Sequence, residues 1–128
     1  MKEIAKKVKA DSFLLMASSN EIRNKCLKNI IENLNKDKEH ILAQNKRDIE
    51  NARLENISSS ILSRLLFDEH KMDTVIAGIN DLIKMPDPIG KITLKRELDE
   101  GLVLTRTTTP IGVIGVIFEA RPDALIQI

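Results

Sequence analysis

The segment PIGVIGVIFEARPDALIQI, residues 110–128, decides the fold of this chain. The run IGVIGVIF after Pro110 is apolar at nearly every position, which is typical of a strand buried on both faces. RPDALIQI then predicts a turn followed by a helix, with Pro122 in the first turn of that helix. A buried strand that leads into a helix is the repeating unit of α/β folds. Because one strand cannot form a sheet, we expect the chain to be the first part of a larger domain.

The residues before this strand predict a β-hairpin. Pro86-Asp87-Pro88-Ile89-Gly90 ends the preceding helix, since proline lacks an N–H and glycine permits positive φ. The arms KITLKREL (91–98) and LVLTRTTT (102–109) alternate or are rich in β-branched residues, and Gly101 lies in the turn between them. We therefore expect two antiparallel strands over residues 91–109.

Residues 1–85 have the apolar spacing of amphipathic helices. Ser18 and Glu21 have capping-box spacing ahead of a second helix, and Asp37, Ser58 and Asp68 stand where three further helices begin. The second helix carries an apolar stripe with a 3.6-residue period, made of Ile22, Cys26, Leu27, Ile30, Ile31 and Leu34. The last helix has the clearest stripe, made of Met72, Val75, Ile76, Ile79, Leu82 and Ile83.

The composition excludes several classes of protein. The chain of 128 residues has a net charge of +1, which gives no overall attraction to nucleic acid or to a membrane. Three Phe residues, with no Trp or Tyr, argue against stacking platforms for bases. No apolar run approaches the roughly 20 residues that span a bilayer, and the patch 13–17 is shorter than the core of a signal peptide. We expect a cytoplasmic protein with neither a nucleic-acid nor a membrane partner.

Neither a nucleophile nor a metal site is predicted in this chain. Cys26, the only cysteine, lies on the apolar stripe of the second helix, and we expect it to pack in the core as a small hydrophobic side chain. A reactive thiol needs a nearby cation, histidine or helix N-terminus, and the local sequence gives no sign of these. His40 and His70 have no second His or Cys at ligand spacing, so we interpret both as solvated.

A charged group follows the apolar strand directly, at Glu119, Arg121 and Pro122. Ligands of open α/β sheets bind beyond the carboxyl ends of the strands, and a guanidinium group matches the oxygens of phosphate and carboxylate. Arg121 is therefore a candidate for holding an anionic substrate. An Arg–Glu pair that caps the strand end explains the same residues equally well. Gly112 and Gly115 lie inside the strand and lack the GxGxxG spacing of a dinucleotide loop.

The run GVIGVIFEARP (112–122) resembles a signature of the γ-glutamyl phosphate reductases, a family of the aldehyde dehydrogenase superfamily. Its EARP ending differs from the proline–tryptophan–asparagine element of other aldehyde dehydrogenases. ILAQNKRDIENAR (41–53) and SILSRLLFDEHKMDTVIAGINDLIKMPDPIG (60–90) are similar to the family's helices and its aspartate–proline turn. The resemblance implies an α/β, aldehyde dehydrogenase-like fold, with amino-terminal helices, a β-hairpin and the first strand of a doubly wound cofactor-binding sheet.

The resemblance also implies a function. The family reduces L-glutamyl 5-phosphate to glutamate 5-semialdehyde and phosphate in proline biosynthesis, with NADPH as cofactor and a cysteine thioester as intermediate. Arg121 would contact the oxyanion or phosphate of the substrate, and Ile117, Phe118 and Glu119 would line the cofactor cleft. Glu119 would either orient Arg121 or face the cofactor. The family's cysteine lies downstream, so we expect no catalytic residue and no activity in this part alone.

We therefore interpret residues 1–128 as an incomplete amino-terminal part of the NADP-binding domain. Its parts are a helical segment (1–85), a hairpin (86–109) and the first strand with the start of a helix (110–128). Hairpins of the superfamily bridge subunits, which implies a homo-oligomer. One alternative is a stand-alone helical interaction module, which the run IGVIGVIF disfavours because it would be an exposed aggregation hazard. The other is an oxidative aldehyde dehydrogenase, against which the EARP ending speaks.

Overall fold

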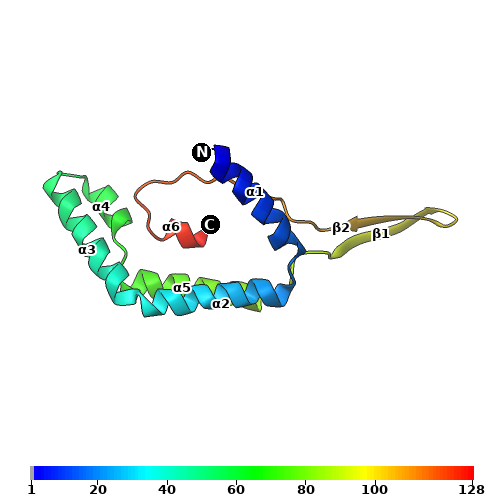
Figure 1. Cartoon of the computed structure of the whole chain (residues 1–128), viewed down its shortest axis with the longest axis horizontal. Helices are drawn as coiled ribbons and strands as arrows, with labels where there is room; N and C mark the ends of the chain where they lie inside the picture. The colour runs from blue at the N-terminus through cyan, green and yellow to red at the C-terminus, as the bar shows by residue number, and fades with distance from the viewer. Residues whose placement is uncertain (1) are drawn as a thin grey trace. The chain divides into compact units, whose positions relative to one another are not determined.

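A computed structural model describes residues 2–128 of the chain, which form six helices and one two-stranded sheet (Figure 1). In chain order the elements are α1 (Lys2–Ala17), α2 (Asn20–Lys36), α3 (Lys38–Leu54), α4 (Ser59–Leu65), α5 (Glu69–Lys84), β1 (Ile92–Asp99), β2 (Leu102–Thr107) and α6 (Ala124–Gln127). They belong to two compact units. The first unit contains the residues up to Asn20 and Pro86–Ile114, and the second contains Glu21–Met85 and Gly115–Ile128.

The first unit contains the predicted hairpin. β1 and β2 pair antiparallel, and the register is shifted near each end of the ladder. Gly101 has φ +74 in the connecting turn, a conformation that side chains with a Cβ rarely adopt. At the open end the Thr108 hydroxyl donates to the carbonyl of Pro88 at 2.6 Å and accepts from the amide of Lys91 at 2.9 Å. Every residue of both strands is exposed, so the hairpin is held by its ladder and its two ends rather than by a core.

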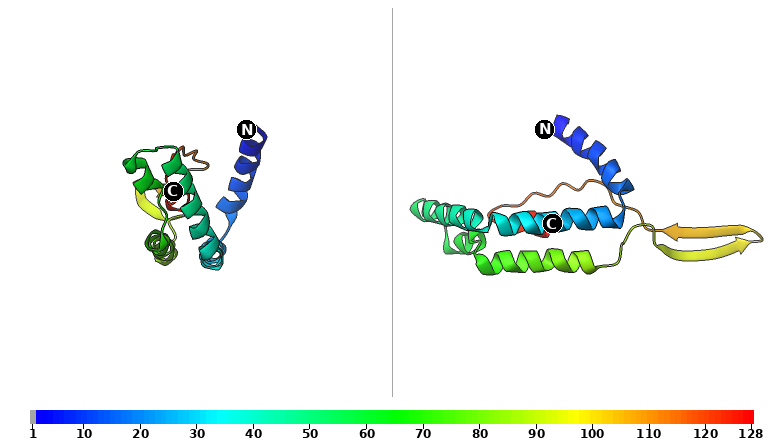
Figure 2. Two further views of the ribbon diagram at one scale, coloured as in Figure 1. Left: turned by 90° about the vertical axis from the view of Figure 1, so that its left-hand side faces the viewer. Right: turned by 60° about the horizontal axis from the view of Figure 1, so that its bottom comes forward.

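The core of the second unit lies along α5. Phe67, Met72, Val75 and Ile79 are buried, and Met72 is completely inaccessible. Helix α2 packs beside α5 and runs in the opposite direction (Figures 1 and 2). Its contribution to the core comes from Leu27, Ile31 and Leu34, one row of the predicted stripe at i, i+4 and i+7.

Two polar contacts tie the ends of this antiparallel arrangement. The side chain of Asn24, near the start of α2, donates to the carbonyl of Ile83 at the end of α5, at 3.5 Å. At the other end, Lys38 follows α2 and bonds Glu69 in the first turn of α5, with Asp73 3.7 Å from its ammonium. These contacts fix which ends of the two helices meet.

The predicted helix starts are correct to within a residue or two, and the predicted side-chain cap of α5 is present. The Asp68 carboxylate accepts from the amide of Lys71 at 2.9 Å, as an N-cap does. Asp37 and Ser58 precede α3 and α4 without a side-chain bond of this kind. Helix α2 begins at Asn20, so Ser19 and not Ser18 stands before it, and the Ser18 hydroxyl donates to the carbonyl of Leu15.

Two predictions differ from the structure. Cys26 is exposed and not in the core, because the α2 stripe is wider than its contact with α5 and leaves Ile22, Cys26 and Ile30 outside. Residues 110–118 form no strand, since an extended segment becomes one only through a ladder and no described residue pairs with them. Gly112, at φ +108, also departs from strand geometry. Whether this segment belongs to a cofactor-binding sheet stays a prediction.

Candidate functional site

The charged turn predicted at residues 119–122 lies beside the helical core of the second unit. Ala120 has φ +51, a conformation that is uncommon for a residue other than glycine and that turns the chain sharply before Arg121. The carbonyl of Arg121 then accepts from the amide of Ala124, the first residue of α6. This turn presents the exposed side chain of Arg121 to an open hollow of about 240 Å³.

The hollow brings Arg121 together with two cations that sequence reasoning did not select. Arg64 comes from the end of α4 and Lys71 from the first turns of α5, and Ser63 and Asp123 complete the lining. Basic and acidic residues are interleaved along these helices, so the sequence suggested only a solvated face. A signal was nevertheless present: Arg64 and Lys71 are seven residues apart across a short break between helices, which can bring two basic side chains to one place.

Hydrogen bonds to main-chain carbonyls fix both of these cations. The ammonium group of Lys71 donates to the carbonyl of Leu66 at 2.6 Å and lies 3.5 Å from that of Ser63. The Nε of Arg64 donates to the carbonyl of Ser60 at 3.3 Å. Each group retains donors for another partner, because an ammonium has three N–H bonds and a guanidinium has five. Across residues 2–128, none of Arg64, Lys71 and Arg121 takes part in an ion pair.

A buried asparagine holds the loop between these two cations. The carboxamide oxygen of Asn45 on α3 accepts from the amide of Phe67 at 2.6 Å, and its nitrogen donates to the carbonyl of Leu65 at 2.9 Å. Asn45 is the one buried polar residue of the part that the structure describes, and both of its ends are paired. It thereby fixes residues 65–67, which connect Arg64 to the helix that carries Lys71.

The three residues proposed to line a cofactor cleft lie in different surroundings. Glu119 lines a small one of about 80 Å³ with Ile61, Arg64 and Ala120. Phe118 lines an apolar one of about 380 Å³, whose walls include Phe67 and Pro122. Ile117 is fully exposed. The structure therefore brings Glu119 close to the cationic group, and it places Ile117 and Phe118 on apolar surface.

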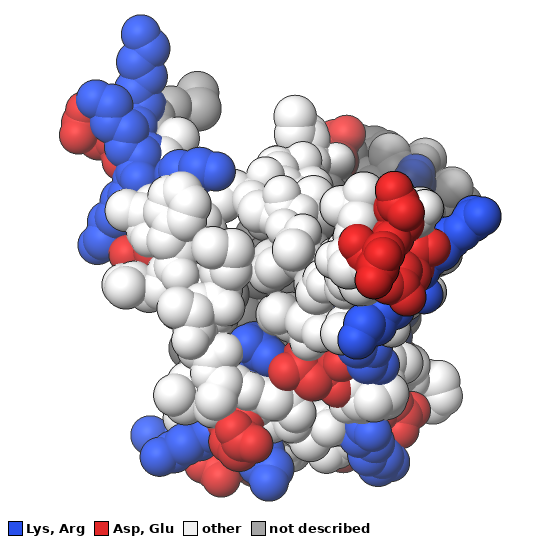
Figure 3. Space-filling model, turned by 90° about the vertical axis from the view of Figure 1, so that its right-hand side faces the viewer, with Lys and Arg blue, Asp and Glu red and all other residues white. Residues whose placement is uncertain are grey.

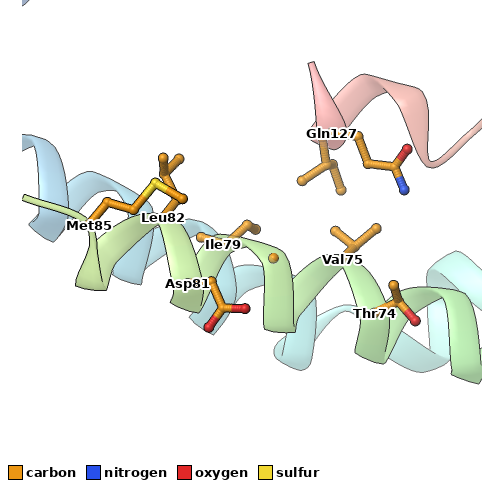
Figure 4. A pocket seen from close by; sticks show the side chains of 9 residues that line it. Thr74, Val75, Ile79, Asp81, Leu82, Met85 and Gln127 are labelled. Carbon is orange, nitrogen blue, oxygen red and sulfur yellow. The ribbon is translucent and has the colours of Figure 1, made fainter. Parts of the chain in front are cut away.

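Another hollow, of about 400 Å³, lies along α5 (Figure 4). Val75, Ile79 and Leu82 line it from α5, and Gln127 of α6 lies across from Val75. Its one ionisable group is the carboxylate of Asp81, so the hollow lacks a set of converging polar groups that would orient a ligand.

The remaining classes of site are not supported by the described residues. Residues 2–128 contain no group of three or more His, Cys, Asp or Glu side chains that could hold a metal ion. His40 and His70 are exposed, as predicted. No helix within that same range is long and apolar enough to cross a bilayer. On the face in Figure 3, basic and acidic side chains are interspersed and form no single large patch of one sign.

Known proteins of similar sequence share one name. No protein-family model matches the chain. The γ-glutamyl phosphate reductase of Acetivibrio thermocellus is 51% identical over 126 residues, covering 98% of this chain and 29% of that protein. The protein of the same name from Pelotomaculum thermopropionicum is 46% identical over the whole chain, which covers 30% of it.

Solved structures agree with the sequence comparison. The crystal structure of γ-glutamyl phosphate reductase from Thermotoga maritima matches 97% of this chain with a TM-score of 0.90 at 32% identity. That from Saccharomyces cerevisiae matches the same share with a TM-score of 0.91 at 38% identity. The chain spans about 30% of the length of these relatives. The predicted aldehyde dehydrogenase-like arrangement of helices and hairpin is thus confirmed for this part.

Proposed function

We propose that this chain, which is homologous to γ-glutamyl phosphate reductases over its whole length, is the amino-terminal part of an enzyme with that activity. The complete protein would convert L-glutamyl 5-phosphate, NADPH and a proton to glutamate 5-semialdehyde, NADP⁺ and phosphate. The observation that carries the proposal is the homology itself, at 51% identity over 98% of the chain. We place the enzyme in the cytoplasm, a compartment that suits the chain's single, unpaired thiol.

Arg121 is the residue of this chain that we assign to the substrate. Its guanidinium is exposed on the hollow, and such a group can hold two oxygens of a phosphoryl group or an oxyanion at once. The Ala120 turn, with its positive φ, sets the direction in which Arg121 leaves the chain. The catalytic cysteine belongs to the downstream part of the enzyme, and we assign no catalytic role to Cys26, which is exposed on the outer row of α2.

The residues of the turn fit a nicotinamide dinucleotide in one respect. A carboxylate such as Glu119 suits the hydroxyl groups of a ribose and repels a phosphate, so we assign Glu119 to the nicotinamide ribose, whose hydroxyl groups carry no phosphate in NADPH. Ile117 and Phe118 offer apolar surface of the kind that a nicotinamide ring contacts. When bound, this cofactor supplies the hydride. The ratio of the kcat/KM values for NADPH and NADH would measure the preference of the complete enzyme for one of them.

The test for Arg121 separates three roles. In the complete enzyme, Arg121→Lys should lower kcat by about tenfold or more if the guanidinium stabilises charge that develops in the transition state. An increase in the KM for substrate with kcat unchanged would assign it to ground-state binding. If both constants stay near their wild-type values, Arg121 has a structural role and is not part of the substrate site. The matched control is Arg47→Lys, an exposed arginine on α3, which should change neither constant.

The hairpin gives a separate proposal about assembly. Both faces of β1 and β2 are exposed, and Leu94, Leu98, Leu102 and Leu104 offer apolar side chains there. We propose that this hairpin associates with a second copy of the protein, because a lone hairpin leaves two unpaired edges. Light scattering should give a mass above that of one chain. A strictly monomeric enzyme at assay concentration would contradict the proposal.

A further inference from the structure

We infer that Arg64 and Lys71 complete, with Arg121, a binding site for a phosphoryl group. The inference rests on the proposed reductase function and deepens it, since both the substrate and the cofactor of that reaction carry phosphates. It starts from the hollow of about 240 Å³ onto which the three cations open. They come from three separate segments, namely the end of α4, the start of α5 and the turn before α6.

The charge of the hollow favours the binding of an anion. Three cations and one carboxylate, Asp123, line it, which leaves an excess of positive charge. None of these cations forms an ion pair anywhere in residues 2–128. Cations that share a site repel one another, and an anion between them removes that cost. Ionised acceptors such as phosphate oxygens form hydrogen bonds to guanidinium and ammonium groups that are roughly twice as strong as neutral ones.

The cations are also held in place before any ligand arrives. The bond from Lys71 to the carbonyl of Leu66 and the bond from Arg64 to that of Ser60 restrict both side chains. Asn45 fixes the loop on which Leu66 lies, through its contacts with Leu65 and Phe67. Long basic side chains on an open surface normally lose rotamer freedom when they bind an anion. Here part of that loss has already occurred on folding, which favours binding over mere solvation.

The experiment uses the complete enzyme in the reverse direction, with the semialdehyde, inorganic phosphate and NADP⁺ at constant ionic strength. Arg64→Gln and Lys71→Met should each raise by about tenfold the KM of the ligand whose phosphoryl group the site holds. A rise in the KM for phosphate alone assigns the site to the substrate, and a rise in the KM for NADP⁺ alone assigns it to the cofactor. If neither KM changes beyond twofold in both variants, the inference is overturned.

Two further variants serve as controls. Asp123→Asn removes the one carboxylate of the hollow and should lower the same KM, which a variant that is merely damaged would not do. Lys84→Met removes an exposed lysine elsewhere on α5, paired with Asp81 at 3.0 Å, and should leave both KM values unchanged.

A readout without turnover separates this inference from the proposed function. Inorganic phosphate and, separately, NADP⁺ should raise the Tm of the wild-type protein, and the ligand that the site holds should lose that effect in Arg64→Gln and Lys71→Met. A wild-type protein without reductase turnover but with a phosphate-dependent Tm that these variants abolish would refute the function and support the site. An active enzyme whose ligand-induced Tm shifts are equal in wild type and variants would support the function and refute the site.

Discussion

Removing the side chain of Asn45 should open the loop that carries the two basic residues of the hollow. Asn45→Ala deletes both the acceptor for the amide of Phe67, at 2.6 Å, and the donor to the carbonyl of Leu65, at 2.9 Å. No other described residue pairs with these two main-chain groups across the loop. The structural damage should therefore be centred on residues 65–67.

The magnitude follows from the surroundings of each group. Phe67 is only 5% exposed, so its amide loses a partner in a place that water does not reach, at a cost of about 1–3 kcal/mol. Leu65 is half-buried and its carbonyl can recruit water, so its loss adds about 0.5–1 kcal/mol. Alanine improves the helix propensity of α3 and returns a few tenths of a kcal/mol. At the middle of these ranges, the net loss should be about 2–3 kcal/mol.

Hydrogen exchange at the amide of Phe67 measures this loss directly. A local destabilisation of 2–3 kcal/mol should speed its exchange by about 30- to 150-fold, while amides of the hairpin keep their rates. Asn33→Ala is the control, since Asn33 also lies in a helix and its side chain bonds only the exposed carbonyl of Asn29. It should change stability by about 0.5 kcal/mol or less. Unchanged exchange at Phe67 in Asn45→Ala would refute the reasoning.

Two other predictions concern the start of α5. Asp68→Ala removes the cap that accepts from the amide of Lys71 and should destabilise the protein by about 1 kcal/mol. The control Ser58→Ala, at a helix start without such a bond, should destabilise it less. Equal losses in Tm would contradict the assignment of the cap. The hydrogen bond with Glu69 raises the pKa of Lys38 above its ordinary value of 10.5. The stability from this contact is therefore fully present below pH 10.5 and is lost as pH rises through the folded-state pKa. The difference in Tm between wild type and Lys38→Met should close in strongly alkaline buffer. A difference in Tm that is constant with pH would show that the charge of Lys38 is irrelevant.

Local patterns in the sequence were sufficient for the helices and the hairpin. The stripe of α5 and the cap at Asp68 involve residues a few positions apart, and so does the turn at Gly101. The same reasoning failed at Cys26, because the width of an apolar stripe does not say how much of it a neighbouring helix will cover. Residues 110–118 form no strand because pairing depends on residues elsewhere and the described chain offers no partner, so their place in a larger sheet stays a prediction.

The candidate site was only half visible in the sequence. Arg121 could be selected because its neighbours mark the end of an apolar run, which is a local signal. The seven-residue spacing of Arg64 and Lys71 is a local signal for that pair alone, since their meeting with Arg121 depends on the loop that Asn45 fixes and on the return of residues 115–128 to the helices. Contacts between residues more than forty positions apart are properties of the packed structure and leave no spacing rule in the chain.

The discontinuity of the second unit has a consequence for the order of events on the ribosome. Helix α5 is synthesised early, but Ile126, which packs against its buried face, arrives only after residues 86–114 have been made. At roughly 5–20 residues per second, synthesis from residue 86 to Ile126 takes about 2–8 s. During this interval the nascent chain carries the apolar face of α5 without the segment that packs against it. Holdase chaperones should therefore bind the emerging chain in this window and release it once the segment from residue 115 onward has docked.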